Sequence, residues 1–251
     1  MARTEVQIRT QDGVCPASVF RPAGKGPWPA VLMYLDGPGI RPALFEMGER
    51  LASSGYYVLL PDLFYRGGAY PPNDVKKLFG TPELRAAWQA KYQNTASIAN
   101  TMQDTKYFLD FLSAQPDVKQ SAIGTTGYCM GGARSLAAAG TYPDRIVAAA
   151  SYHGGNMATD APDSPHLFAP KIKGRVYVAG ADEDPFFPEA QKQRLTEALQ
   201  KAHVNHVVET YIGAKHGWVP TDTPVYNPAA AERHWQSLTS LFDATLKARA
   251  S

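Results

Sequence analysis

The stretch from Thr125 to Ala133 constrains the fold of this chain most. Its residues, Thr-Thr-Gly-Tyr-Cys-Met-Gly-Gly-Ala, lead from an apolar, strand-like run into an alanine-rich, helix-like run, with Cys129 at the junction. This is the form of a nucleophile elbow, a sharp strand-to-helix turn that lifts one side chain above a sheet while flanking glycines leave room for the backbone. The stretch therefore predicts a strand that ends before Cys129 and a helix that begins after it.

Strand-like and helix-like segments alternate along the rest of the chain. Nearly continuous apolar runs, typical of parallel strands covered on both faces, predict strands at 29–35, 56–60, 121–128, 146–152, 175–179 and 206–212. Apolar side chains at helical spacing predict helices at 43–54, 82–92, 95–114, 130–140, 187–202 and 229–246. Polar and apolar residues alternate only around Asp12-Gly13, which predicts a hairpin. The expected fold is α/β, an open and mostly parallel sheet with helices on both faces, in one domain over residues 1–251.

The composition bears on several classes of protein. A net charge of +2 with scattered Lys and Arg gives no stripe for nucleic acid. Two cysteines, Cys15 and Cys129, are too few for a disulfide framework or a cysteine zinc site. No apolar run approaches the length of a membrane span, and the N-terminus lacks the apolar core of a signal peptide. We expect a cytoplasmic protein that binds neither nucleic acid nor membrane and uses no metal or organic cofactor.

Three residues with complementary chemistry each follow the end of a predicted strand within a few positions: Cys129, Asp182 and His216. In an open parallel sheet the carboxyl ends of the strands share one edge, where functional groups gather. Because Asp182 is followed by Glu183 and Asp184, either of these acids is an alternative partner for the histidine.

These residue types suit nucleophilic catalysis. A cysteine attacks as a thiolate, so Cys129 needs a base, which His216 can supply. A histidine needs a partner on its other ring nitrogen to fix its tautomer, and Asp182 can accept that proton. The elbow also places Cys129 at a helix N-terminus, where the dipole favours a thiolate and the Met130 amide can face a developing oxyanion.

On these features the chain resembles the dienelactone hydrolase family of the α/β-hydrolase superfamily, over essentially its whole length. The most specific motif is G-x-C-x-G-G at residues 127–132. Supporting segments are the Asp12-Gly13 hairpin and residues 57–64, 179–184, 211–217 and 226–235. The order cysteine, aspartate, histidine is also the α/β-hydrolase order. The resemblance implies that Cys129, Asp182 and His216 form a catalytic triad.

The resemblance also implies roles for the loop after the predicted strand 29–35. The amides of Met130 and Gly37 would form the oxyanion hole. Asp36 stands where well-known members of the family carry a glutamate, which holds the resting cysteine and helps to generate its thiolate. Aspartate is one methylene shorter, so this role for Asp36 depends on whether the loop brings its carboxylate within reach.

Family members that cleave dienelactones hold the substrate carboxylate with arginines, and one of those positions is Pro220 here. Arg85 is the candidate for another. Further candidates for substrate contact, with packing in the core as the alternative, are Trp88, Tyr128, His153 and Trp218. Cys15, with no histidine or acid beside it in sequence, is expected to be structural.

The sequence thus predicts a cysteine-dependent hydrolase of ester or lactone bonds, similar to the carboxymethylenebutenolidases of aromatic-compound degradation. It would act on a small molecule through a thioester intermediate. The alternatives are an esterase for neutral aromatic esters, a non-catalytic ligand-binding protein on the same fold, and a thiol redox protein that pairs Cys15 with Cys129. We expect a monomer or a weak homo-oligomer, and the sequence leaves open whether residues 66–92 form a lid.

Overall fold

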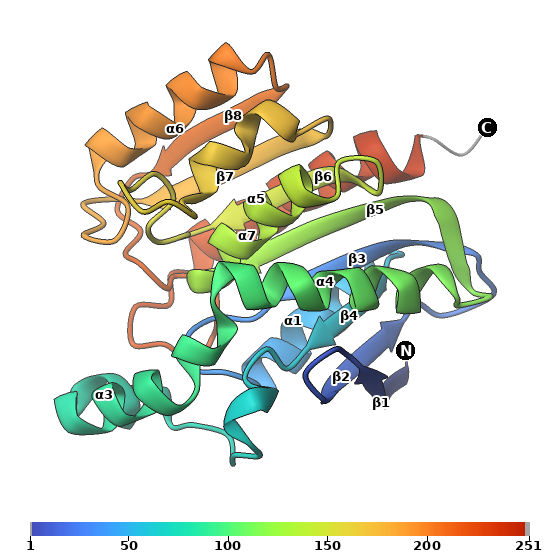
Figure 1. Cartoon of the computed structure of the whole chain (residues 1–251), viewed down its shortest axis with the longest axis horizontal. Coiled ribbons are helices and arrows are strands. Elements are labelled where there is room, and N and C mark those ends of the chain that lie inside the picture. The colour runs from blue at the N-terminus through green and yellow to red at the C-terminus, as the bar shows by residue number, and fades with distance from the viewer. Residues whose placement is uncertain (1, 249–251) are drawn as a thin grey trace.

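The computed structural model describes residues 2–248, and its centre is an eight-stranded sheet (Figure 1). In chain order the strands are β1 (Ala2–Arg9), β2 (Val14–Arg21), β3 (Trp28–Tyr34), β4 (Tyr57–Pro61), β5 (Val118–Tyr128), β6 (Ile146–Tyr152), β7 (Arg175–Ala181) and β8 (His206–Tyr211). They lie across the sheet in the order β1-β2-β4-β3-β5-β6-β7-β8. β2 runs antiparallel to β1 and β4, and every pair from β4 to β8 is parallel. The parallel strands therefore end at one edge of the sheet.

Helices cover both faces of the sheet. They are α1 (Pro42–Ser53), α2 (Val75–Gly80), α3 (Pro82–Lys91), α4 (Ile98–Ser113), α5 (Met130–Thr141), α6 (Glu189–Lys201) and α7 (Pro228–Phe242), with 3-10 turns at Tyr65–Gly67, Gln93–Ala96 and Pro165–Lys171. Figure 1 shows α4, α5 and α6 in front of the sheet and α1 and α7 behind it. This layering explains the continuous apolar runs, because strands such as β4 are buried on both faces. The predicted α/β architecture is confirmed.

The structure departs from the predicted elements mainly between residues 61 and 98. Where the sequence predicts one helix, at 82–92, the segment between β4 and α4 contains two, α2 and α3, which form an arm (residues 75–91) that extends from the body at the lower left of Figure 1. α2 was not predicted because Val75–Gly80 is only six residues long. With two buried side chains it is too short to show a periodic apolar pattern. Elsewhere the bounds differ by a few residues. β5 begins at Val118 rather than 121, and α7 gives way to a π-helical turn at Asp243–Lys247.

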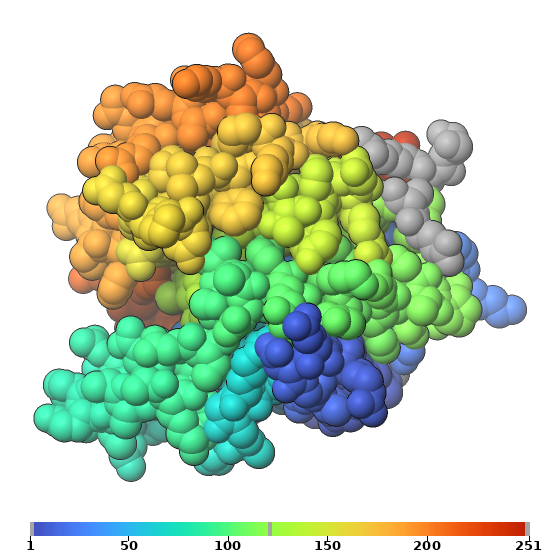
Figure 2. Space-filling model, in the orientation of Figure 1, coloured from blue at the N-terminus to red at the C-terminus, as the bar shows by residue number. Residues whose placement is uncertain are grey.

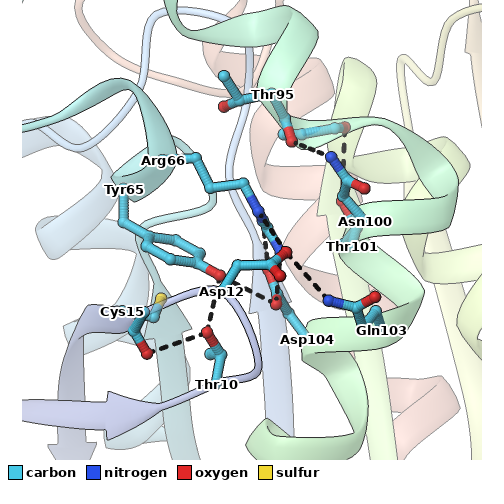
Figure 3. Close-up of polar contacts among 12 residues, drawn as sticks. Thr10, Asp12, Cys15, Tyr65, Arg66, Thr95, Asn100, Thr101, Gln103 and Asp104 are labelled. Carbon is cyan, nitrogen blue, oxygen red and sulfur yellow. Dashed lines mark hydrogen bonds and ion pairs between the residues drawn. The ribbon is translucent and has the colours of Figure 1, made fainter.

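A polar network joins the N-terminal hairpin to α4 (Figure 3). Arg66 donates to both carboxylate oxygens of the buried Asp104 and to Asp12 in the hairpin turn. Tyr65 adds contacts to Asp104 and to Thr10. The guanidinium thus supplies a counter-charge for a carboxylate that is 1% exposed, which a buried acid needs.

Within residues 2–248, no helix combines the length and the apolar character needed to cross a bilayer.

Candidate active site

Cys129 occupies a strained turn between β5 and α5. Its φ of 54° and ψ of −120° are unusual for a residue with a side chain. The turn closes tightly enough that a Cβ on Gly127 would lie 2.0 Å from the Gly131 carbonyl oxygen, and one on Gly131 would lie 2.4 Å from the carbonyl oxygen of Leu35. Only glycine fits these two positions, so the predicted elbow has a steric basis in its flanking glycines.

The thiol of Cys129 meets a histidine and an acid from two further loops. His216, in the loop after β8, has Nε2 3.1 Å from Cys129 Sγ. Its other ring nitrogen, Nδ1, lies 2.8 Å from Asp184 Oδ2, in the loop after β7. The Asp184 side chain is fully buried, and its second oxygen accepts the Phe186 amide at 2.9 Å. The three side chains form one hydrogen-bonded chain from carboxylate to sulfur.

The acid that contacts His216 is Asp184. The expectation that Asp182 faces His216 is wrong. Asp182 instead joins the two loops, since its amide donates to the Ala214 carbonyl at 2.8 Å and its Oδ2 accepts the Gly213 amide at 2.9 Å. Glu183 then adopts a left-handed conformation with φ of 48°, which redirects the chain. The acid that follows this turn, and not the first one after the strand, reaches the imidazole.

The surroundings of His216 favour its charged form. Burial alone would lower the pKa of His216, but the negative charge of Cys129 and the hydrogen bond to Asp184 outweigh burial and raise it to about 10. At neutral pH the ring is therefore an imidazolium held between the Cys129 sulfur and the Asp184 carboxylate. An imidazolium at this distance can neutralise a thiolate, the form in which a cysteine attacks.

A cavity of about 610 Å³ opens beside the thiol, lined by Cys129, His216, Met130, Gly37 and Arg85 among others. The arm provides one of its walls through Phe79, Arg85 and Gln89. Phe186 also lines the cavity, beside the imidazole of His216 with ring centroids 4.9 Å apart. Figure 2 shows the surface hollowed between the arm and the rest of the molecule. The arm is thus a wall of the site.

Two backbone positions beside the sulfur suit an oxyanion hole. Met130 is the first residue of α5, so its amide has no acceptor within the helix. Gly37, in the loop after β3, lines the same cavity, and its carbonyl accepts Trp88 Nε1 at 2.8 Å and Gln93 Nε2 at 2.9 Å. These two donors fix the Gly37 backbone, which is what Trp88 contributes to the site.

Asp36, expected to activate the thiol, is engaged elsewhere. Both of its carboxylate oxygens accept from the fully buried Arg41, at 2.5 and 2.9 Å. Arg41 also donates from Nε to Asp222 at 2.6 Å. Burial raises the pKa of the Asp36 carboxyl, and the positive charge of Arg41 opposes that rise. Among the described residues the hydrogen-bond partner of the Asp36 side chain is Arg41, so a contact with the Cys129 thiol is not formed.

Most of the aromatic candidates for substrate contact lie in the core. Tyr128, His153 and Trp218 are each 0% exposed, and none lines the cavity, so the expected substrate contacts are wrong for these three. The Tyr128 hydroxyl lies 3.0 Å from His234 Nε2, and the Trp218 ring stacks on Tyr211. His153 accepts the Cys129 amide on Nδ1 at 3.1 Å.

Sequence reasoning missed Arg134, which lines the cavity one turn into α5. Its Nη groups donate to the carbonyls of Met130 and Ala96, and its Nε meets no partner within the described part of the chain. Burial lowers its pKa to about 10, so Arg134 is charged at neutral pH. The signal was available, because Arg134 is the one charged residue in the otherwise small and apolar segment 130–140.

The structure also bears on a possible metal site and on the second cysteine, Cys15. No group of three or more His, Cys, Asp or Glu side chains in residues 2–248 is arranged to hold a metal ion. Cys15 is a free and fully buried thiol on β2, and burial raises its pKa. Strands β4 and β3 separate β2 from β5 in the sheet, so Cys15 lies far from the elbow thiol.

Comparison with known proteins shows which family the chain belongs to. Residues 15–246 match the model of the dienelactone hydrolase family. A candidate carboxymethylenebutenolidase of Synechocystis sp. is 28% identical over 97% of both chains, and the carboxymethylenebutenolidase of Pseudomonas putida is 26% identical over 90% of both. Among solved structures, a dienelactone hydrolase candidate from Klebsiella pneumoniae has a TM-score of 0.83 at 21% identity, covering 96% of this chain and 98% of that one. The chain therefore belongs to the dienelactone hydrolase family, and it is a hydrolase with the α/β-hydrolase fold.

Proposed function

We propose that this protein hydrolyses ester or lactone bonds through a thioester on Cys129, with His216 as the acid and base and Asp184 as its orienting partner. The observation that carries the proposal is the continuous contact from Asp184 Oδ2 through the imidazole to Cys129 Sγ, over 2.8 and 3.1 Å. This contact opens onto a cavity large enough for a small molecule.

Acylation begins with the thiolate attacking the carbonyl carbon of the substrate. The carbonyl oxygen becomes an oxyanion, which the amides of Met130 and Gly37 stabilise. His216, protonated at the start, then gives its Nε2 proton to the leaving oxygen as the carbon–oxygen bond breaks. Asp184 holds the ring so that this proton points toward the reacting atoms. The products of the step are an alcohol and a thioester on Cys129.

Deacylation uses the same groups in reverse. The imidazole, now neutral, removes a proton from a water molecule that attacks the thioester carbonyl. The second oxyanion occupies the same pair of amides, and collapse of the intermediate releases the acid and returns the thiolate beside the imidazolium. In a lactone the alcohol and the acid belong to one molecule, so a single ring-opened hydroxy acid leaves.

The cavity lining favours substrates that carry a negative charge over neutral aromatic esters. Arg134 and Arg85 both line it, and the guanidinium of Arg134 has carbonyl oxygens as partners and no carboxylate within salt-bridge distance in residues 2–248. Asp163 is the one carboxylate among the lining residues, and it acts on Arg134 through a charge interaction without a salt bridge, so two cations face one acid and an anionic ligand is favoured. Phe79 and Phe186 add apolar area for the rest of the substrate.

Cys129→Ala tests the nucleophile. We expect it to lower kcat on p-nitrophenyl esters by on the order of 10⁴-fold or more, as for removal of other catalytic nucleophiles. Cys15→Ala is the matched control, because it removes the other thiol, from a strand outside the cavity. A Cys129→Ala protein with the activity of the wild type would rule the proposal out.

Charge preference is tested with a pair of esters that differ only in a carboxylate, such as phenyl acetate and 4-carboxyphenyl acetate. Arg85→Gln should lower kcat/KM for the anionic ester by about tenfold and leave the neutral one within about twofold, because it removes one charge-assisted contact. Lys91→Gln removes a charge from the same helix outside the cavity lining and serves as the control. Equal effects of Arg85→Gln on both esters would favour a neutral substrate.

A non-catalytic ligand-binding protein on this fold is distinguished by thiol reactivity. The contact with His216 predicts that iodoacetamide alkylates Cys129 faster at neutral pH than it alkylates an ordinary thiol. This advantage should disappear in His216→Ala. If Cys129 reacts at the rate of an ordinary thiol in both the wild type and His216→Ala, the result would support a non-catalytic ligand-binding protein.

A further inference from the structure

His153 follows β6 directly and has no role in the reaction steps proposed above. Its side chain is 0% exposed, and its backbone φ of 41° lies in the left-handed region. Strained backbone that carries a buried ionisable side chain beside a reactive group is characteristic of functional sites.

The ring of His153 contacts the backbone of the nucleophile. The Cys129 amide donates to His153 Nδ1 at 3.1 Å and to the Tyr152 carbonyl at 3.2 Å. A ring nitrogen that accepts a hydrogen bond carries no proton, so the proton of the neutral ring is on Nε2. Nε2 meets no acceptor in the described chain. The ring lies edge-on to Trp218 and His216, with centroids 4.9 and 5.4 Å away.

The surroundings keep His153 neutral. Burial lowers the pKa of His153 well below the usual value, and the positive charge of His216 lowers it further. Protonation would put a hydrogen on Nδ1, directly facing the hydrogen of the Cys129 amide. At neutral pH the ring is therefore an acceptor.

We propose that His153 is a positioning residue for Cys129. By accepting the Cys129 amide it holds the elbow in the conformation that keeps Sγ 3.1 Å from His216 Nε2 and the start of α5 against the cavity. A left-handed residue with a side chain persists only where its surroundings over-determine it. His153 and Tyr152 together provide that constraint from the end of the neighbouring strand. The inference rests on the proposed function, because it gives His153 a part in the same reaction.

The test compares two substitutions at one position. His153→Leu keeps the bulk and removes the acceptor. His153→Asn retains a polar oxygen near the place of Nδ1, and asparagine tolerates left-handed backbone. His203, at φ 55° on the surface, is the matched control, since His203→Leu places the same side chain in left-handed backbone without any contact to the elbow. The measurements are kcat and KM on a p-nitrophenyl ester, and the pH midpoint for alkylation of Cys129 by iodoacetamide.

We expect His153→Leu to lower kcat by about 10- to 100-fold with KM within about threefold, the size of effect that a displaced reacting group produces. Its alkylation midpoint should move to higher pH, because a loosened elbow lengthens the contact from sulfur to imidazolium. His153→Asn should keep kcat within about fivefold of wild type and leave the midpoint in place.

Two results would overturn the inference: a folded His153→Leu with the kcat and midpoint of wild type, or a folded His153→Asn impaired as strongly as His153→Leu. If His153→Leu does not fold, His153→Gln takes its place, because its amide reaches the position of Nε2 and not that of Nδ1. Failure of the proposed function is separate, since it would appear as activity in Cys129→Ala. An inert Cys129→Ala together with an unaffected His153→Leu overturns only the role of His153.

Discussion

At the scale of single residues, Asp182 and Asp184 provide a matched pair two positions apart. Asp184→Asn should lower kcat by on the order of 10²- to 10⁴-fold, because the amide no longer fixes the tautomer and charge of His216. Asp182→Asn should stay within about twofold of wild type, since its side chain can still accept the Gly213 amide. Steady-state kinetics of the two variants checks this. A larger loss in Asp182→Asn than in Asp184→Asn would contradict the contact seen at His216.

The protonation of His216 gives a second residue-scale prediction. Burial opposes the imidazolium, but the charge of Cys129 and the hydrogen bond to Asp184 raise the pKa of His216 to about 10. NMR titration of the ring should therefore find it protonated at pH 8 in the wild type. Cys129→Ala should move the midpoint down, because the largest favourable contribution is removed. The same midpoint in both proteins would contradict this account.

The sign of the linked stability follows from the direction of that shift. The unfolded chain has a histidine pKa of about 6.5, so the folded state binds the proton more tightly. The stabilisation by the imidazolium is complete below pH 6.5 and is lost as the pH rises through 10. As the pH rises from 6.5 to 10, the free energy of unfolding of the wild type should therefore approach that of Cys129→Ala.

The sequence predicts those parts of the site that depend on local steric requirements and not those that depend on the folded structure. Cys129 could be predicted because the elbow needs small neighbours at fixed positions, and this need is visible in the sequence. The choice between Asp182 and Asp184 could not, since it depends on a left-handed turn at Glu183 that the residue types do not specify. The ion pair of Asp36 could not be predicted either. Its partner Arg41 is a buried cation, and nothing in the local sequence indicates that Arg41 is buried.

At the scale of elements, the arm formed by α2 and α3 carries two exposed apolar side chains that differ in position. Phe79 is 43% exposed and lines the cavity, and Leu84 is equally exposed but lies outside the lining. Phe79→Ala should raise KM by about fivefold with kcat little changed, because it removes apolar contact with bound substrate. Leu84→Ala should leave both parameters as they are. A fall in kcat without a change in KM for Phe79→Ala would show that the arm acts on chemistry and not on binding.

The elements themselves were predictable in proportion to their burial. The central strands are apolar on both faces and longer helices such as α4 have a regular apolar stripe, so their existence and type follow from the pattern. α2 and the turn at Pro165–Lys171 are short, partly exposed and stabilised by what they pack against. Their sequences carry little periodic signal, and tertiary contacts decide their structure.

At the scale of the whole molecule, Arg41 joins the loop after β3 to the loop that follows His216, through Asp36 and Asp222. Arg41→Met should lower the free energy of unfolding by about 3–5 kcal/mol, because it leaves a buried carboxylate without its counter-charge. Lys173→Ala, at the exposed pair with Asp144, is the control and should change it by less than about 1 kcal/mol. Urea denaturation measures both. A loss in Arg41→Met no larger than in the control would mean that Asp36 is held by other contacts.

The link from Arg41 to Asp222 spans 181 positions of the sequence, and the contact from Cys129 to His216 spans 87. A ribosome synthesises the chain from its N-terminus, so Cys129 and its elbow emerge before His216 and Asp222. A nascent chain that has not yet reached residue 216 carries a thiol without a base beside it. The contact between Cys129 and His216 can therefore form only after β8, the last strand of the sheet, has been synthesised.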